Sequence, residues 1–198
     1  ITADGNKVET PYYSIEFLPD GSMLSLYDKE LCREWVSGDF NKLKMYHDTP
    51  GNYDAWDILP NYKDRPCDLP VIKPFEFVRA DGEVAEFEVI FATEKSKWQM
   101  ILRLFRQSRG IEIESNVDWH EKHKLVKAEY DCNVLSRELL CDTSAGIIRR
   151  ETHRNTSWQQ ARFEVCHHKW CDMAEQGGGV ALINQGKYGV SAEKNVMA

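Results

Sequence analysis

The sequence predicts an all-β fold, a large antiparallel β-sandwich, and two observations support this prediction. Short segments in which apolar and polar residues alternate recur along the 198-residue chain, as expected of strands with one buried and one solvated face. Polar turn sequences that contain glycine separate neighbouring segments, as in β-hairpins. We expect residues 1–10, which are polar and turn-like, to be a linker leading into one β-sandwich domain of residues 11–198.

Three hairpins are predicted in the first 120 residues. Their turns contain Gly21, Gly82 and Gly110, each between two alternating runs. Residues 120–130 fit either a strand or one helical turn, and we favour a strand because residues 119–122 read as a bend between two extended runs. The predicted hairpins join segments 13–17 and 24–26, 71–77 and 84–91, and 98–104 and 111–119.

The second strand of the third hairpin carries four polar residues on one face: Glu112, Glu114, Asn116 and Asp118. This face fits either a ligand surface or the solvated side of the sheet. The solvated side is the commoner case in antiparallel sheets.

An irregular surface loop is predicted from residue 52 onward, because prolines at positions 60, 66 and 70 exclude a central strand. Its first residues hold two aspartates, Asp54 and Asp57, that flank aromatic residues. Carboxylates accept paired sugar hydroxyls and an aromatic ring covers the apolar face of a sugar, so the segment suits a binding rim. A loop pinned to the domain by burial of Tyr53 and Trp56 fits the same residues equally well.

Residues 153–189 are the part of the chain richest in side chains typical of sugar-binding sites. Residues 161–166 alternate polar and apolar residues and predict a strand. The three glycines at 177–179 predict a loop or bulge before the apolar run 180–183. We therefore expect a sheet surface that ends in a turn. Its candidate side chains are Asn155, Trp158, Arg162, Glu164, His167, His168, Trp170, Asp172 and Tyr188.

A metal site is the alternative for the centre of this stretch, which holds Cys166, His167, His168 and Cys171. On an extended strand, Cys166 and His168 point one way and His167 and Cys171 the other, so the four cannot meet one ion. We favour packed cysteines and half-exposed histidines, and no metal bound by this part of the protein.

Charge and hydropathy restrict the class of partner. The net charge is −7 and the basic residues are scattered, which argues against a nucleic-acid surface or an anionic membrane. No apolar run approaches the roughly 20 residues that cross a bilayer. An uncharged partner fits this composition better.

Six cysteines are too few for a disulfide scaffold, and most lie in apolar strand contexts, as free buried thiols do. This pattern predicts a cytoplasmic protein. The Asn155-Thr156-Ser157 sequence matches the N-glycosylation pattern, but one such match occurs often by chance.

No reaction centre is identifiable in the sequence. It has no Gly-x-Ser-x-Gly motif and no glycine loop followed by the lysine of a phosphate site. The 32 acidic residues do not single out a pair at the roughly 5 Å spacing of retaining glycosidases. The chain presents binding groups without a recognisable catalytic set.

Several uncommon blocks, in order and with similar spacing from about residue 8 to 190, resemble the C-terminal region of glycoside hydrolase family 38 α-mannosidases. These blocks lie at residues 20–30, 53–58, 119–129, 153–158, 161–165 and 187–189.

The resemblance implies a retaining exo-mannosidase that acts on terminal α-linked mannose with an aspartate nucleophile and a zinc ion. In that family both belong to an upstream catalytic domain, so we expect no catalytic residue and no cofactor here, and zinc in the catalytic domain. The family's C-terminal part is a galactose-mutarotase-like supersandwich that packs on the catalytic domain and contributes to the rim of its cleft. The resemblance therefore implies a substrate-binding role for Trp56 and Asp57. His120, Arg162, Glu164, His168 and Trp170 also match family blocks, and hydrogen-bonded networks between strands explain them equally well.

The family pattern would supply further strands after Ala198, so we expect a sandwich truncated at its C-terminus. Its exposed sheet edge predicts a homo-oligomer. Two main hypotheses follow: the non-catalytic sandwich of a larger α-mannosidase, or a stand-alone carbohydrate-binding or scaffolding sandwich. A Cys/His metal protein is a third.

Overall fold

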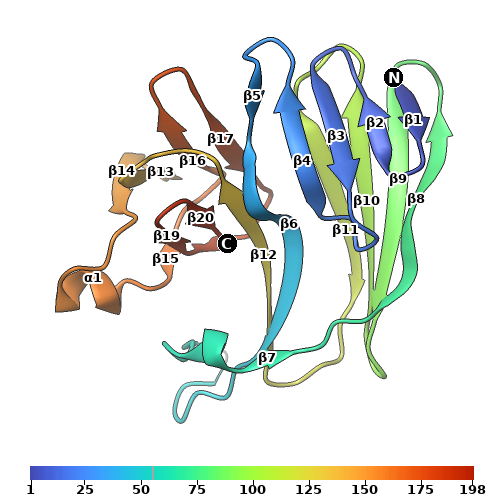
Figure 1. Ribbon diagram of the computed structural model, residues 1–198. Helices are drawn as coiled ribbons and strands as arrows, with labels where there is room; N and C mark the ends of the chain where they lie inside the picture. The colour runs from blue at the N-terminus through green and yellow to red at the C-terminus, as the bar shows by residue number, and fades with distance from the viewer. Residues whose placement is uncertain (55) are drawn as a thin grey trace. The chain divides into compact units, whose positions relative to one another are not determined.

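The computed structural model describes residues 1–54 and 56–198, and it confirms the all-β fold (Figure 1). Neighbouring strands pair antiparallel, as in the hairpins of each unit. The chain divides into two compact units, residues 1–128 and 129–198, where the sequence suggested one domain from 11 to 198. The division falls inside a continuous strand, which is why no break in composition marks it.

The first unit opens with a five-stranded sheet in chain order. Residues 1–10 are not a linker, because they supply its first two strands and the side chain of Val8 is fully buried opposite Ile15. Two three-residue strands among polar residues give too short a run for alternation to be recognised. The sheet consists of β1 (Thr2–Asp4), β2 (Lys7–Glu9), β3 (Tyr13–Phe17), β4 (Met23–Asp28) and β5 (Arg33–Glu34).

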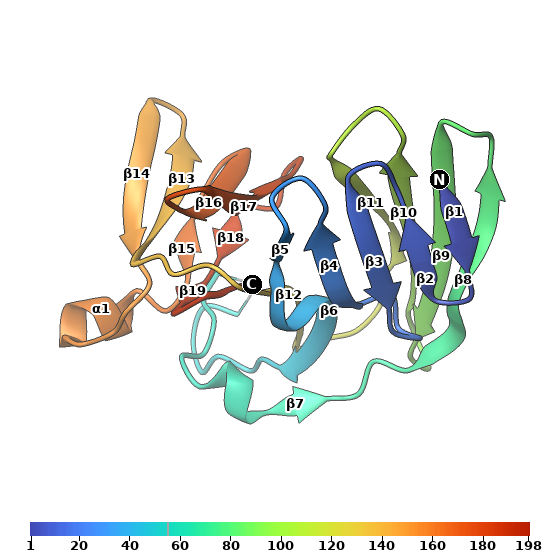
Figure 2. The same ribbon diagram turned by 45° about the horizontal axis from the view of Figure 1, so that its top comes forward.

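A four-stranded sheet of order β11-β10-β9-β8 forms the second layer of this unit (Figure 2). The two sheets pack through aromatic rings: Phe17 stacks on Phe75 at 4.3 Å and lies 6.0 Å from Phe87. The three predicted hairpins are confirmed, one in the first sheet and two here. The strands are β8 (Val71–Ala80), β9 (Val84–Ala92), β10 (Lys97–Phe105) and β11 (Ile111–Asp118).

Gly21 lies in the first turn and requires the freedom of glycine. Its φ is +77°, and a Cβ atom there would lie 2.9 Å from Cγ1 of Val89 and 3.0 Å from Cε of Met100. The turn therefore closes over the core of the sandwich, where Val89 and Met100 are each 1% exposed.

The remaining strands of the first unit frame a long loop. β6 (Val36–His47) pairs with β7 (Pro66–Cys67), and the short 3₁₀ helix η1 (Tyr62–Asp64) lies between them in sequence. β12 (Lys124–Cys132) confirms the strand expected within residues 120–130, and it continues into the second unit.

The second unit is built on a four-stranded sheet of order β14-β13-β16-β17. Leu139, Cys141, Cys171 and Met173 are fully buried on one of its faces. The sheet consists of β13 (Glu138–Thr143), β14 (Gly146–Glu151), β16 (Trp170–Glu175) and β17 (Gly178–Ile183). Short strands complete the unit: β15 (Val165–Cys166), β18 (Gly189–Val190), β19 (Ala192–Glu193) and β20 (Val196–Met197).

The strand predicted at residues 161–166 is largely wrong. Only β15 at its end is extended, and the preceding residues belong to the helix α1 (Ser157–Ala161) and a turn. A capping box explains the helix: the Thr156 hydroxyl accepts from the N–H of Gln159, and the Gln159 side chain accepts from the N–H of Thr156. The helix ends at Ala161, and residues 162–164 that follow it form a turn and bends, which leaves only Val165 and Cys166 in a strand.

The three glycines at 177–179 close the hairpin between β16 and β17. Gly177 and Gly178 have φ values of +101° and +151°. Gly179 allows close approach instead, since a Cβ atom there would lie 2.5 Å from the carbonyl oxygen of Met173. The predicted loop is confirmed as a turn that includes Gly177, but Gly178 and Gly179 already belong to β17, whose register with β16 contains no bulge.

Candidate functional site

The loop that holds Trp56 and Asp57 presents its aromatic side chains to solvent. Trp56 is 92% exposed and Tyr53 is 78% exposed, so burial of these two rings does not pin the loop. The N–H groups of Trp56 and Asp57 donate to the carbonyl oxygen of Tyr53 at 2.8 and 3.1 Å. Both side chains that follow this turn, Trp56 and Asp57, are exposed.

A different tyrosine anchors the loop. Tyr62 is 1% exposed and packs edge-on against Tyr46 of β6, with ring centroids 5.1 Å apart. The carboxylate of Asp48 accepts from the N–H of Leu59 at 3.2 Å, and the N–H of His47 donates to the carbonyl of Arg65 at 2.8 Å. The loop thus has a fixed base and an open tip, which is the form of a binding rim.

Residues from the start of β12 lie beside this loop. The N–H of Asp48 donates to the carbonyl oxygen of His123 at 2.9 Å, and Nδ1 of His123 lies 3.7 Å from Oδ1 of Asp54. Lys124 places its Nζ 3.1 Å from Nδ1 of His47. Sequence reasoning missed His123 and Lys124, because some 70 positions separate them from the loop and no motif links them.

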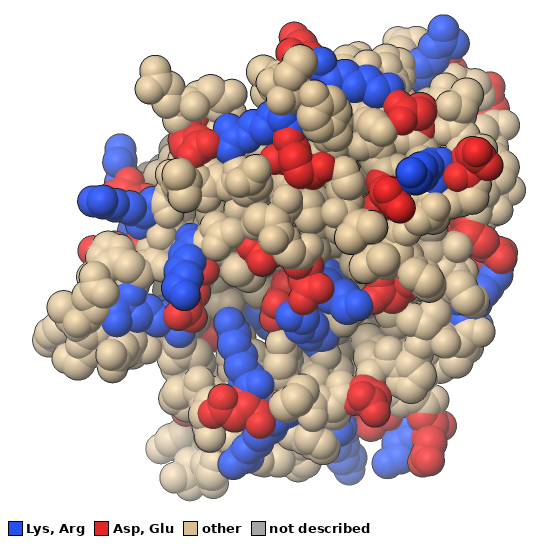
Figure 3. All heavy atoms as spheres, in the orientation of Figure 1, with Lys and Arg blue, Asp and Glu red and all other residues tan. Residues whose placement is uncertain are grey.

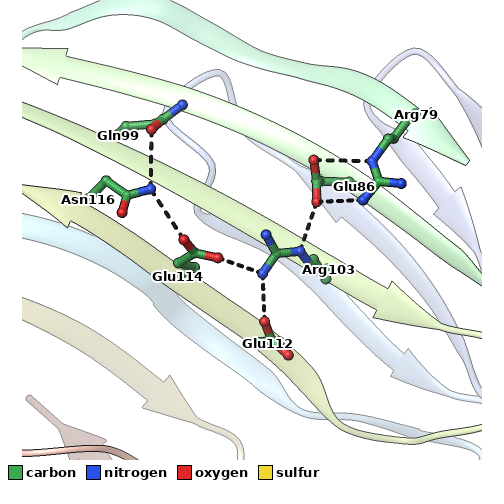
Figure 4. Close-up of polar contacts among 7 residues, drawn as sticks. All are labelled: Arg79, Glu86, Gln99, Arg103, Glu112, Glu114 and Asn116. Carbon is green, nitrogen blue, oxygen red and sulfur yellow. Dashed lines mark hydrogen bonds and ion pairs between the residues drawn. The ribbon is translucent and has the colours of Figure 1, made fainter.

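The exposed face of the β8–β11 sheet carries a connected polar network (Figure 4). Arg103 lies at its centre and pairs with Glu86 at 2.8 Å, Glu112 at 2.6 Å and Glu114 at 2.7 Å. Hydrogen bonds to Glu86, Glu114 and Glu112 raise the pKa of Arg103, and those from Arg103 and Arg79 lower the pKa of Glu86. These carboxylates are already compensated by cations, which favours the solvated-side interpretation of this face.

Positive and negative side chains are interspersed on the surface seen in Figure 3, as the scattered basic residues of the sequence suggested. No helix within residues 1–54 and 56–198 has the length and apolar character needed to span a membrane.

The sugar-type residues of 153–189 do not gather at one point. Trp158 is 77% exposed on α1, and Arg162 follows the end of that helix. His168 stacks on Tyr188 with ring centroids 5.6 Å apart. In the first unit, His120 places Nε2 2.8 Å from Asp118.

Asp142 organises the chain between β15 and β16. Its Oδ1 accepts from the N–H groups of His168, Lys169 and Trp170 at 3.1, 2.7 and 2.9 Å. Burial alone would raise the pKa of Asp142, but these three donors outweigh it and hold the pKa below its ordinary value. The network is structural, because it fixes the backbone that leads into β16.

The cysteines and histidines of this stretch do not fit a zinc site. Cys166 is exposed on β15, whereas Cys171 is fully buried on β16 opposite Cys141. Within the described part of the chain, no group of three or more His, Cys, Asp and Glu side chains is placed to hold a metal ion.

Known proteins resemble this chain over almost its whole length. Residues 8–198 match the family described as glycosyl hydrolases family 38, C-terminal domain. Alpha-mannosidase 2C1 of Homo sapiens is 30% identical over 196 residues and alpha-mannosidase G of Dictyostelium discoideum is 32% identical over 194 residues, covering 91% and 93% of this chain. The alpha-mannosidase of Saccharomyces cerevisiae is 29% identical over 201 residues and covers 89%. The chain spans 18% of the length of each relative.

A solved structure shares the fold. The crystal structure of an alpha-mannosidase from Enterococcus faecalis V583 superposes with a TM-score of 0.78 at 9% identity, covering 97% of this chain and 25% of that one. The match over residues 8–198 shows that the chain belongs to the family of glycosyl hydrolases family 38 C-terminal domains.

Proposed function

We propose that this chain is the non-catalytic C-terminal β-sandwich portion of a longer retaining α-mannosidase that hydrolyses terminal α-linked mannose. The observation that carries the proposal is the extent of the match. Nearly the whole chain aligns with alpha-mannosidases, yet it accounts for only 18% of their length. Most of the polypeptide of such enzymes therefore lies outside the matched region.

The reaction centre belongs to that other region under this proposal. Zinc would be held there, because the Cys and His side chains described above do not fit it. The sandwich itself buttresses the catalytic domain and shapes the edge of the substrate cleft. Its partners are the catalytic domain and, through the cleft, the α-mannoside.

Trp56 and Asp57 are the proposed contact with substrate. An exposed indole covers the apolar face of a pyranose, and a neighbouring carboxylate accepts its hydroxyl groups. A loop with a buried base holds both groups in place before the sugar arrives, which reduces the entropic cost of binding. The exposure of Trp56 supports this role, because a ring that only packed the loop would be buried.

Steady-state kinetics of the longer protein test whether Trp56 contacts the substrate. We expect Trp56→Ala to raise KM for a synthetic α-mannoside about 3- to 10-fold, corresponding to about 0.7–1.4 kcal/mol of lost ring contact, with kcat little changed. Leu135→Ala is the matched control, since Leu135 is 91% exposed in the second unit. If KM is the same in both variants and in the unmodified protein, the proposed contact between Trp56 and substrate is contradicted.

A stand-alone carbohydrate-binding or scaffolding sandwich is the second candidate. The exposure of Tyr53, Trp56 and Trp158 favours it, because sugar-binding surfaces present aromatic rings. Titration of the 198-residue chain with mannose, read by tryptophan fluorescence and compared with Trp56→Phe, measures this activity directly. Saturable binding by the chain alone supports this second candidate.

We further propose a cytoplasmic location. Cys132, Cys141 and Cys171 are buried as free thiols, and Cys32 and Cys166 are exposed, as a reducing compartment permits.

The edge strand β17 contains no charged residue, so it is the candidate edge for a homo-oligomer. Sedimentation of the chain over a range of concentrations tests that association.

A further inference from the structure

Two of the buried cysteines lie directly opposite each other in the second unit. Cys141 of β13 and Cys171 of β16 are partners in the antiparallel register, and both thiols are free. Both side chains are fully buried on one face of the sheet, the face that also carries Leu139 and Met173. The two thiols therefore leave neighbouring strands on the same side, as a disulfide between strands requires.

The spacing of antiparallel strands matches the geometry of a disulfide. Residues directly opposite each other have Cα atoms about 4.5 Å or about 5.5 Å apart, depending on their position in the hydrogen-bond ladder. Disulfides span Cα separations of roughly 4.4–6.8 Å. Both spacings fall in this range, so a bond between Cys141 and Cys171 leaves the pairing of β13 with β16 in place.

The third buried cysteine of this unit is placed differently. Cys132 lies on β12, which belongs to another sheet, and its thiol donates to the carbonyl oxygen of Tyr130 at 3.5 Å. The strand register thus distinguishes the pair Cys141 and Cys171 from Cys132, although burial alone does not.

A buried guanidinium nitrogen lies on the same face as the two thiols. Arg150 of β14 is directly opposite Leu139, which places it beside Cys141. Its Nε atom is buried, and within residues 1–54 and 56–198 no hydrogen-bond partner reaches it. Burial raises the pKa of Cys141 to about 11, and the adjacent guanidinium opposes that rise. An arginine beside a cysteine stabilises the thiolate, which is the form that reacts.

We infer that Cys141 and Cys171 are a redox-active dithiol, which hydrogen peroxide converts into a disulfide bond between β13 and β16. The Cys141 thiolate attacks one peroxide oxygen and the O–O bond breaks, which yields the sulfenic acid of Cys141 and, with the proton that the thiol released, one water. The Cys171 thiolate then attacks the sulfenic sulfur, the S–O bond breaks, and a second water leaves. Two thiols lose two electrons in total, and one peroxide accepts them.

Burial makes this reaction slow and gives it a structural consequence. Peroxide and water reach the pair only when the sheet opens locally, and the thiolate forms in the same opening. The disulfide closes the long loop between residues 141 and 171, which reduces the conformational freedom of the unfolded second unit. The oxidised chain is therefore the more stable form, and a reductant reverses the change.

Peptide mapping of the oxidised chain tests the inference. The starting protein is the 198-residue chain with Cys32, Cys67 and Cys166 replaced by serine, so that only the buried three thiols remain. After treatment with hydrogen peroxide in urea below the unfolding transition, we expect a non-reduced peptide that joins Cys141 to Cys171. The urea midpoint should rise as this peptide forms, and dithiothreitol should restore the starting value.

Single replacements in this background separate the roles of the thiols. Cys132→Ser should leave the disulfide unchanged. Cys171→Ser should stop the reaction at the sulfenic acid of Cys141, which dimedone traps for mass spectrometry. Cys141→Ser should give several-fold less trapped sulfenic acid at Cys171, because Arg150 adjoins Cys141. Alanine replaces serine at either position where circular dichroism shows that the serine variant is unfolded.

Three results would overturn the inference. One is a disulfide that joins Cys132 to Cys171, and another is oxidation of Cys141 and Cys171 to separate sulfinic acids with no bond between them. The third is a Cys141–Cys171 disulfide that lowers the urea midpoint, since the native strand pairing would then not accommodate the bond. Trapping of sulfenic acid mainly at Cys171 would overturn the assigned order of attack.

Discussion

Arg109, in the turn between β10 and β11, forms an ion pair with Asp28 of β4 and so joins the two sheets of the first unit. The side chain of Asp28 is 1% exposed. The guanidinium also lies 5.5 Å from the ring centroid of Tyr12 and 5.4 Å from that of Tyr13. The sandwich is therefore held by an ion pair between the partly exposed Arg109 and the buried Asp28 as well as by its aromatic core.

Removal of this cation should destabilise the first unit. We expect Arg109→Met to lower the free energy of unfolding by about 2–4 kcal/mol, because it leaves the Asp28 carboxylate buried without a charge partner. Urea denaturation followed by tryptophan fluorescence measures the change. Arg149→Met, which breaks an exposed pair with Glu138, should cost no more than about 0.5 kcal/mol. Equal losses for the two variants would show that the Asp28 pair adds nothing beyond a surface contact.

The pH dependence of stability follows from the same aspartate. Burial raises the pKa of Asp28, but the N–H of Leu31 and the side chains of Arg109 and Trp35 outweigh it, so the folded-state pKa is below the ordinary value. A group of this kind stabilises the fold above its unfolded pKa, about 3.9, and the contribution is lost as the pH falls through the folded value.

We therefore expect the urea midpoint to fall as the pH is lowered below about 4. Asp28→Asn should be less stable at pH 7 and should lose less on acidification than the unmodified chain. Asp68→Asn, at an exposed loop position, serves as control and should follow the unmodified curve. Parallel curves for Asp28→Asn and the unmodified chain would refute this assignment.

Gly179 should be intolerant of any side chain. A Cβ atom there would lie 2.5 Å from the Met173 carbonyl oxygen and 2.6 Å from the Ala174 Cβ, and backbone cannot move aside cheaply. We expect Gly179→Ala to cost roughly 1–3 kcal/mol of unfolding free energy. Gly189→Ala is the control, with nothing within 4 Å of the added atom and an expected change within about 0.5 kcal/mol. Thermal unfolding in which both variants match the unmodified chain would contradict the close approach of β16 and β17.

Thiol reactivity should divide five of the six cysteines into two groups, with the half-buried Cys67 between them. Burial raises the pKa of Cys132 and Cys171 to about 12 and that of Cys141 to about 11, so little thiolate forms at pH 8. Iodoacetamide should label the exposed Cys32 and Cys166 in the folded chain, and the buried three only after unfolding in urea. Peptide mass spectrometry measures the labelling. Modification of Cys171 in the folded chain as fast as that of Cys166 would disprove its burial.

The hairpins were predictable because local alternation and glycine turns determine them. The pairing of 97–105 with 111–118 is an example, since eight consecutive residue pairs keep one register. Residues 1–10 were misjudged, because β1 and β2 are each only three residues long. The sequence does not predict helix α1 although Thr156 and Gln159 have capping-box spacing, because a helix of five residues without a buried side chain gives no apolar periodicity.

The candidate site was predictable only in part. An exposed aromatic loop follows from its prolines and aspartates, but the sequence could not distinguish Tyr53 and Trp56, which are exposed, from Tyr62, which is buried. That distinction depends on the ring of Tyr46 from a separate strand. The neighbouring His123 comes from another part of the chain, and contacts over such separations leave no trace in one sequence.

Hydrolysis of p-nitrophenyl α-mannoside by the purified 198-residue chain, beside the longer protein at equal concentration, tests the central claim most directly. The account predicts that the longer protein releases mannose with retained configuration and that the chain alone releases none above buffer. Release of mannose by the chain alone, in proportion to its concentration and through successive purification steps, would show that the reaction centre lies within these residues and would contradict the account.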